Sequence, residues 1–199
     1  MTTLLRAYPF AWSALVHLLT ALGAALVPET DVLVPLRQET VVDLWPLVIA
    51  LPAALWGWTL HTPDRDLVGA LPRSAARVRL ALLTWCLVLG ASTVVLGALV
   101  AGRELELGLR NYLIVAAVTL VTACVVPHEH VWLLPVMIVA VTWIYGAEDY
   151  SHLPRSGAIL IWPTERAGWA WGALALLVAA LVWLRMGDAR AFRSTPRLW

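Results

Sequence analysis

The sequence contains no lysine, because all fourteen of its basic residues are arginine. A Walker A phosphate loop needs a lysine that reaches the β- and γ-phosphates of the nucleotide. A Schiff-base enzyme needs a lysine amine. The absence of lysine therefore excludes both an ATPase site and a Schiff base from this chain.

Charge, cysteine and catalytic groupings are also scarce. Charged residues make up 14% of the 199 residues, compared with about 25% in an average soluble domain. We expect the two cysteines, Cys86 and Cys124, to be small buried side chains rather than a disulfide. The sequence has no Ser-His-Asp grouping, CxxC pair, nucleophile elbow or H-E-x-x-H helix. We therefore expect this chain to be no enzyme and to hold no cofactor of its own.

Long uncharged apolar runs dominate what is present. Hydrophobic residues make up 61% of the sequence, and the mean hydropathy is +0.79. A membrane-spanning helix needs about 20 predominantly apolar residues, and the continuous runs do not alternate as barrel strands do. The sequence therefore predicts an all-α, polytopic membrane protein, a single transmembrane domain over residues 1–199. Its six transmembrane helices are predicted at about 7–27, 44–60, 80–102, 111–126, 131–147 and 167–184.

The arginines are distributed unevenly between the two sides of these predicted helices. Nine lie on the side of the chain ends, and five lie on the opposite side among most of the acidic residues. Because loops rich in Lys and Arg stay in the cytoplasm, the bias predicts that both termini are cytoplasmic. The arginine-rich, lysine-free composition is typical of a GC-rich bacterium, so we expect a multi-pass protein of the bacterial cytoplasmic membrane. The nine are Arg6, Arg65, Arg73, Arg77, Arg79, Arg185, Arg190, Arg193 and Arg197; the five are Arg37, Arg103, Arg110, Arg155 and Arg166.

Polar residues are rare between the predicted helix ends. No Asp, Glu or Arg falls there, and only His17 lies near the middle of the membrane. Ionisable residues inside a membrane bundle often mark a substrate path, so His17 is a candidate path residue. Trp56, Trp85 and Trp143 are further candidates, as tryptophans within the predicted helices that could face a lumen. The alternative is that His17 is a neutral, hydrogen-bonded histidine and the tryptophans pack in the core.

The stretch "VPHEHVW" raises the question of a metal site. His128, Glu129 and His130 offer three ligands, and His61 is a further imidazole on the same side. Zinc needs three or four such ligands. A short polar turn between two apolar helices needs solvated residues in any case, and this interpretation is favoured. His17 has no second histidine at matching depth, which argues against haem.

The segment between the second and third predicted helices, residues 64–79, crowds arginine into an apolar chain. Pro72 suits the first turn of a helix, so we expect a helix that begins there and continues into the third span. Arg73 and Arg77 are four residues apart and share a face of this helix. The segment either attracts lipid headgroups as a topology signal or docks a cytoplasmic protein.

The pattern "DRDLVGALPRSAARVRLA" resembles the segment after the second helix of ABC-type export permeases. The resemblance implies that this segment is a coupling helix held by a separate cytoplasmic ATPase, which would carry the ATP and Mg²⁺. It also implies a second copy or a related permease chain as partner, a tight inner turn at "PHEH", and a re-entrant outer segment at 148–166, where an ordinary interfacial loop is the alternative. The matching positions are Asp64, Arg65, Asp66, Leu67, Leu71, Pro72, Arg73, Ser74 and Arg77.

The expected function is therefore the permease subunit of an ATP-driven exporter. Apolar walls, tryptophans and few fixed charges favour an amphipathic or hydrophobic cargo. Membrane lipids are expected partners, and nucleic acid is not. One alternative is an accessory or immunity membrane protein that binds a partner complex without transport. The other is a membrane-bound metal or redox enzyme.

Overall fold

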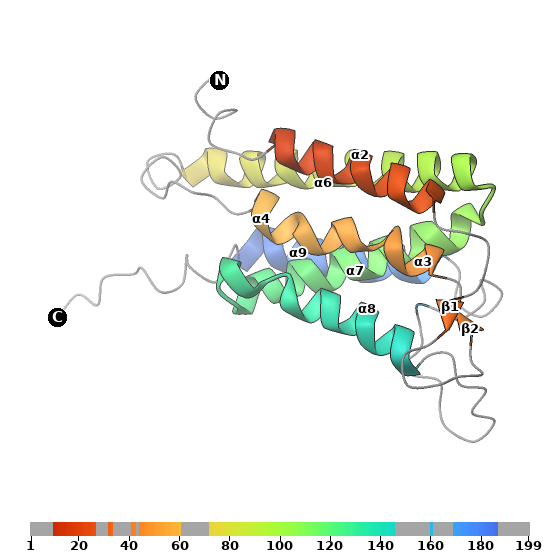
Figure 1. The fold of residues 1–199 in the computed structure, drawn as a ribbon. Helices are drawn as coiled ribbons and strands as arrows, with labels where there is room; N and C mark the ends of the chain where they lie inside the picture. Colours follow the sequence, from red (N-terminus) through yellow and green to blue (C-terminus); the bar gives the residue numbers. More distant parts are fainter. Residues whose placement is uncertain are drawn as a thin grey trace.

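The computed structural model describes residues 10–26, 32–33, 41–42, 44–60, 72–145, 160 and 169–186. This part of the chain is almost entirely helical, which confirms the predicted helical class (Figure 1). Two short strands, β1 (Val32–Leu33) and β2 (Val41–Val42), pair antiparallel, with Val32 opposite Val42. The helices are α2 (Phe10–Leu26), α3 (Trp45–Val48), η1 (Leu51–Leu55), α4 (Trp56–Leu60), α6 (Pro72–Ala101), α7 (Leu105–Val125), η2 (His128–His130), α8 (Leu133–Tyr145) and α9 (Trp169–Met186).

Three of the described helices are long and apolar enough to cross a membrane. They are Arg77–Ala101 within α6, Leu105–Val125 and Trp169–Met186. Their outer faces carry exposed large apolar side chains, such as that of Leu99, which is 74% exposed. Exposed apolar surface of this extent is unusual for a soluble monomer, and it is compatible with a membrane protein. Shorter apolar helices cover Ala11–Ala24, Trp45–Leu55 and Leu133–Ile144.

The second predicted helix, residues 44–60, is not continuous. It is divided into α3, η1 and α4, and η1 is a 3₁₀ helix. The break has a local cause, because Pro46 and Pro52 lie at the starts of α3 and η1 and proline has no N–H to donate within a helix. The connecting turn uses i to i−3 hydrogen bonds, such as Ala53 N to Ala50 O at 3.1 Å. The prediction of one regular helix over this range was wrong.

The third and fourth predicted spans, 80–102 and 111–126, lie mostly within helices that begin before them. Helix α6 begins at Pro72, which confirms the predicted helix start, and it continues without interruption to Ala101. Helix α7 begins at Leu105 rather than at 111. Arg110, expected in an outer loop, therefore lies inside an apolar helix, and that expectation was wrong.

A tight connection makes α6 and α7 neighbours. Gly102 has a φ of +64°, a conformation that favours glycine, and it ends α6. The next residue, Arg103, donates its N–H to the carbonyl of Ala98 at 3.0 Å, as in a Schellman motif. The chain therefore reverses within a few residues, and α7 runs back beside α6 (Figure 1).

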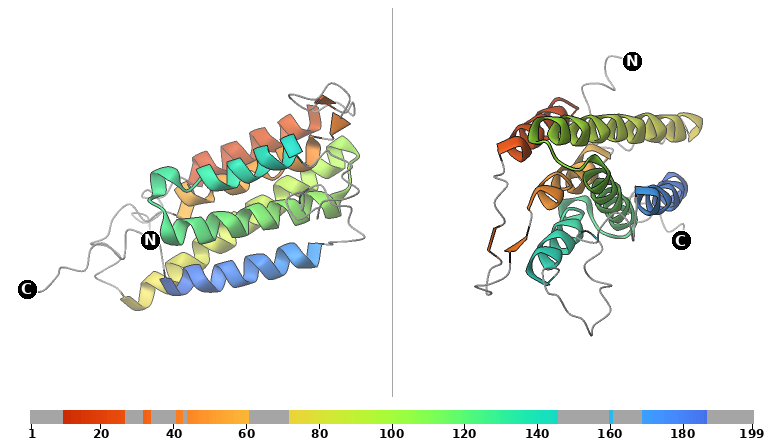
Figure 2. Two further views of the ribbon diagram at one scale, coloured as in Figure 1. Left: turned by 90° about the horizontal axis from the view of Figure 1, so that it is seen from below. Right: turned by 90° about the vertical axis from the view of Figure 1, so that its right-hand side faces the viewer.

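Helix α7 lies at the centre of the molecule. In its apolar window 67% of the residues are buried, against 39% for α6 and 28% for α9. It packs most extensively on α9 and also contacts η1, α6, α8 and α3 (Figure 2). A Cβ on Gly172 would lie 2.8 Å from the backbone oxygen of Arg110 and 3.1 Å from the Cβ of Leu113. The absence of a side chain at Gly172 therefore permits the close approach of α9 to α7.

Candidate functional site

Three polar side chains from distant parts of the chain meet inside the bundle. The hydroxyl of Tyr112 on α7 lies 2.8 Å from Nε2 of His17 on α2 and 2.8 Å from Nε1 of Trp56 on α4. The other imidazole nitrogen, Nδ1, lies 2.7 Å from the carbonyl oxygen of Ser13. All three side chains are buried. We call His17, Trp56 and Tyr112 the polar triad.

The partners of the polar triad determine where its protons are. A carbonyl oxygen only accepts, so Nδ1 of His17 carries a proton and donates it to Ser13. In a neutral imidazole Nε2 is then an acceptor, and it accepts a hydrogen bond from the phenolic O–H of Tyr112. The phenolic oxygen in turn accepts the indole N–H of Trp56. Every donor and acceptor is used with His17 neutral, so the triad avoids a charge in an apolar interior.

The backbone of helix α6 also packs against the polar triad. A Cβ built on Gly90 would collide with the phenol ring and hydroxyl of Tyr112. The α6 backbone therefore lies directly against this ring. Only glycine at position 90 allows the two helices to approach this closely. Any displacement of α6 along α7 at this level would act on the Tyr112 side chain.

A second buried polar cluster lies one turn or less away along α7. Arg110 and Asn111 are both fully buried, and both donate to the carbonyl oxygen of Leu160, at 3.2 Å from Arg110 Nη2 and 2.6 Å from Asn111 Nδ2. Arg110 Nε also donates to Asn111 Oδ1 at 3.2 Å, and Asn111 Nδ2 lies 3.3 Å from the carbonyl oxygen of Pro46. The carboxylates of Glu104 and Glu106 interact electrostatically with the guanidinium.

The sequence contains one indication that this second cluster lies within a helix. Acidic residues favour the first turn of a helix because they complement its dipole, and Glu106 occupies the first turn of α7. Starting the helix at this acid would have placed Arg110 within it, next to Asn111. The partner carbonyl of Leu160 is some fifty residues distant, and no local pattern indicates it.

The four candidate path residues occupy different surroundings. His17 and Trp56 meet in the polar triad, as described above. Trp143 on α8 is half-buried, and its indole N–H, although buried, has no hydrogen-bond partner among the described residues. Trp85 lies on the outer face of α6 and is 37% exposed. Tyr112, which joins His17 to Trp56, was not among the sequence candidates.

The candidate coupling segment is described only from Pro72 onward. Arg77 is exposed on the first turns of α6, while Pro72, Arg73 and Ser74 are placed by the backbone of that helix. The remaining candidates lie outside the described residues: Asp64, Arg65, Asp66, Leu67 and Leu71.

The candidate metal ligands form a turn between α7 and α8. Residues His128–His130 make up η2, and the N–H of His130 donates to the carbonyl of Pro127 at 2.9 Å. The side chains of Glu129 and His130 are exposed, and His61 lies outside the described residues. Where the chain is described, no group of three or more His, Cys, Asp or Glu side chains is placed to hold a metal ion. Cys86 and Cys124 are both buried thiols, and the thiol of Cys124 donates to the carbonyl of Leu120 at 3.3 Å.

The comparisons with known proteins leave the residues themselves as the basis for assigning a function. The chain matches no protein-family model, no curated protein and no solved structure.

Proposed function

We propose that this protein is the transmembrane permease subunit of an ABC-type exporter. In this proposal the chain has six membrane segments, with both ends in the cytoplasm of a bacterium. It pairs with a second copy or a related chain around a central path. A separate ATPase binds its 64–79 segment, and that subunit binds and hydrolyses the ATP.

The length of α6 is the observation that carries the proposal. Its uncharged part, residues 80–101, is about 33 Å long at 1.5 Å per residue, which matches a hydrocarbon core of about 30 Å. We take the Gly102 turn, where φ is +64°, to lie near one membrane face. The first eight residues, 72–79, therefore extend about 12 Å beyond the opposite face. This extension contains Arg73, Arg77 and Arg79 and no acid.

A continuous helix of this kind can transmit a force from outside the membrane to its interior. A partner that moves the arginine-bearing extension moves the whole of α6, because the helix has no break between Pro72 and Ala101. The movement reaches Gly90, whose backbone lies against Tyr112. Hydrolysis on the partner ATPase would in this way act on the polar triad and switch the path between the two sides.

The remaining membrane segments come from the shorter apolar helices. Helix α2 has 17 residues and α8 has 13, so they extend for about 26 Å and about 20 Å. The broken segment α3–η1–α4 lies against the central helix α7. Interrupted helices are tolerated in membranes where they are buried within protein or line a cavity, and they commonly border binding sites in transporters.

The interior favours a hydrophobic or amphipathic cargo. The packed core is apolar, and the polar triad satisfies its hydrogen bonds within the protein without a net charge. A cargo with a largely apolar body matches such surroundings. Trp143, with a buried indole N–H, is a further group that such a cargo could engage.

Co-purification tests the proposal directly. We expect the tagged chain, extracted from its own cells in a mild detergent, to retain a protein with a Walker A loop. Arg77→Glu reverses a charge on the α6 extension and should release that protein. Arg185→Glu reverses an exposed charge on α9, outside the extension, and serves as the matched control that should retain it.

The alternatives predict different results in the same preparation. An accessory or immunity protein would show no cargo-stimulated ATP hydrolysis after the assembly is reconstituted in liposomes. A metal or redox enzyme would show a bound metal by elemental analysis or an absorption band in the visible range. Absence of any nucleotide-binding protein in the preparation would overturn the exporter assignment.

A further inference from the structure

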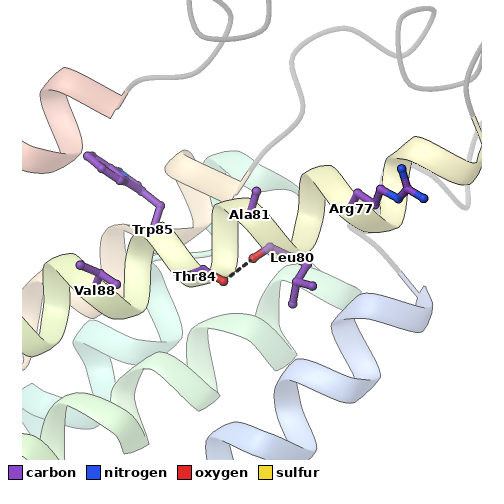
Figure 3. A pocket seen from close by; sticks show the side chains of 6 residues that line it. All are labelled: Arg77, Leu80, Ala81, Thr84, Trp85 and Val88. Atoms are coloured by element: carbon purple, nitrogen blue, oxygen red, sulfur yellow. Dashed lines mark hydrogen bonds between the residues drawn. The ribbon is translucent and has the colours of Figure 1, made fainter. Parts of the chain in front are cut away.

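The outer face of α6 contains a shallow, open hollow that begins at Arg77, on the arginine-bearing extension, and continues along the uncharged part of the helix. It is lined by one face of this single helix over three turns: Arg77, Leu80, Ala81, Thr84, Trp85 and Val88. Figure 3 shows the Arg77 guanidinium at one end, Trp85 and Val88 at the other, and the small side chain of Ala81 between them.

The wall of this hollow is apolar below Arg77. The hydroxyl of Thr84 donates to the carbonyl of Leu80 within the helix at 2.9 Å, so its hydrogen-bonding capacity is directed to the backbone (Figure 3). Leu80, Trp85 and Val88 present large apolar groups that are between 37% and 56% exposed. An occupant of the hollow would therefore be polar only at the Arg77 end.

The dimensions of the hollow match one leaflet of a bilayer. From Leu80 to Val88 the helix rises about 12 Å, within the roughly 15 Å that one leaflet contributes to the hydrocarbon core. Arg77 lies about 4.5 Å further along the helix, at the level of the headgroups. An arginine at that level with an apolar strip leading inward matches the arrangement of a phosphate and its acyl chains.

Along α6 and α9, the two described helices at the Arg77 end, the charge has one sign. Neither α6 nor α9 contains an acidic residue. Arg79 directs a guanidinium nitrogen to the carbonyl of Leu184 on α9 at 3.3 Å, so it faces the neighbouring helix. Arg77 is then the cation that lines the hollow, and an anionic headgroup there would meet no opposing carboxylate from these two helices.

We propose that this hollow binds one anionic phospholipid. The Arg77 guanidinium holds the phosphate through charge-assisted hydrogen bonds. An acyl chain lies along Leu80, Ala81 and Val88, and the Trp85 indole covers it. The site depends only on α6 being embedded in a membrane, so it stands whether or not the chain is a permease.

Native mass spectrometry of the purified chain in detergent tests the site. The probes are dioleoyl phosphatidylglycerol, which is anionic, and dioleoyl phosphatidylcholine, which has the same acyl chains and no net charge. We expect one phosphatidylglycerol to remain bound at concentrations where phosphatidylcholine has dissociated. Loss of an arginine at an anionic interface should weaken binding about fivefold, so Arg77→Gln should raise the dissociation constant by about that factor.

Two further variants separate a built site from general attraction. Arg185→Gln removes the same charge from α9 at the same end of the bundle but outside the hollow, and it should change affinity less than about twofold. Ala81→Trp keeps every charge and fills the hollow, and it should abolish the tightly bound lipid. Circular dichroism and size-exclusion chromatography confirm that each variant is folded before its affinity is measured.

Several results would overturn the proposal. Equal losses for Arg77→Gln and Arg185→Gln would show attraction to the surface charge as a whole. Equal binding of the two lipids, or an unaffected Ala81→Trp variant, would place the lipid elsewhere. A lipid-free dimer that Ala81→Trp converts to a monomer would assign the hollow to a second copy of the chain.

Discussion

Replacing Tyr112 by phenylalanine removes one oxygen atom from the centre of the bundle and leaves the ring in place. That oxygen makes both interhelical hydrogen bonds of the polar triad, with His17 on α2 and Trp56 on α4. Interhelical side-chain hydrogen bonds in membrane proteins contribute about 0.6 kcal/mol on average and at most about 1.7 kcal/mol each. The loss of two such bonds is therefore expected to lower the free energy of unfolding by about 1–3 kcal/mol.

The matched control is a buried hydroxyl on the same helix whose hydrogen bond joins no other element. Thr119 is fully buried, and its hydroxyl donates to the carbonyl of Val115 one turn earlier at 2.9 Å. Thr119→Val preserves shape, and bonds of this type add little to helix stability. We expect its free energy of unfolding to change by less than about 0.5 kcal/mol.

Both variants can be measured by titrating the protein from mild-detergent micelles into sodium dodecyl sulfate while helical circular dichroism is followed. The difference between Tyr112→Phe and Thr119→Val isolates the contribution of the bonds between helices. If Tyr112→Phe destabilises the protein no more than Thr119→Val, the polar triad does not hold α2 and α4 to α7, and the reasoning is refuted.

Three further perturbations have clear expected outcomes. Gly90→Ala should destabilise the protein by about 1–3 kcal/mol, because the new Cβ collides with the packed phenol ring of Tyr112. The control is Gly23→Ala, whose new Cβ has no atom within 4 Å. In the same titration this control should be neutral or should stabilise the protein by up to about 1 kcal/mol. Asn111→Leu removes the donor to two carbonyl oxygens and should cost about 1–3 kcal/mol, whereas an unchanged unfolding midpoint would show that these bonds contribute nothing. Ser74→Cys, with both native cysteines replaced, should resist a membrane-impermeant thiol reagent applied to intact cells and react after lysis; labelling from outside would invert the proposed topology.

Much of the helical architecture follows from the composition of short segments. Uncharged runs of about 20 residues must satisfy their backbone hydrogen bonds internally in lipid, and residues 80–101 and 169–184 do lie within long helices. The start of α6 at Pro72 was predictable because proline suits the first turn of a helix. The division of residues 44–60 also had a local signal in Pro46 and Pro52. The prediction of one helix there considered only the number of apolar residues and not these two prolines.

The polar clusters depend on contacts that no local pattern contains. Tyr112 meets a histidine 95 positions earlier in the chain, so its neighbours along α7 give no indication of its partner. Arg110 looked like a loop residue because a charged side chain in a membrane is expensive. Its cost is offset by a backbone carbonyl 50 positions away and by the adjacent amide. A hydropathy scale assigns each residue a value that does not depend on its neighbours in space. It therefore places in a loop a charged residue that distant groups stabilise inside a helix.

The short reversal at Gly102 has a consequence for how the protein assembles. Helices α6 and α7 are joined by so few residues that they can associate as a hairpin with little loss of chain entropy. Contacts between residues close in sequence form sooner than distant ones, so this hairpin is expected to be the first stable unit after synthesis. The hydrogen bond between the Tyr112 hydroxyl and the His17 imidazole therefore forms only when α2 docks on the hairpin.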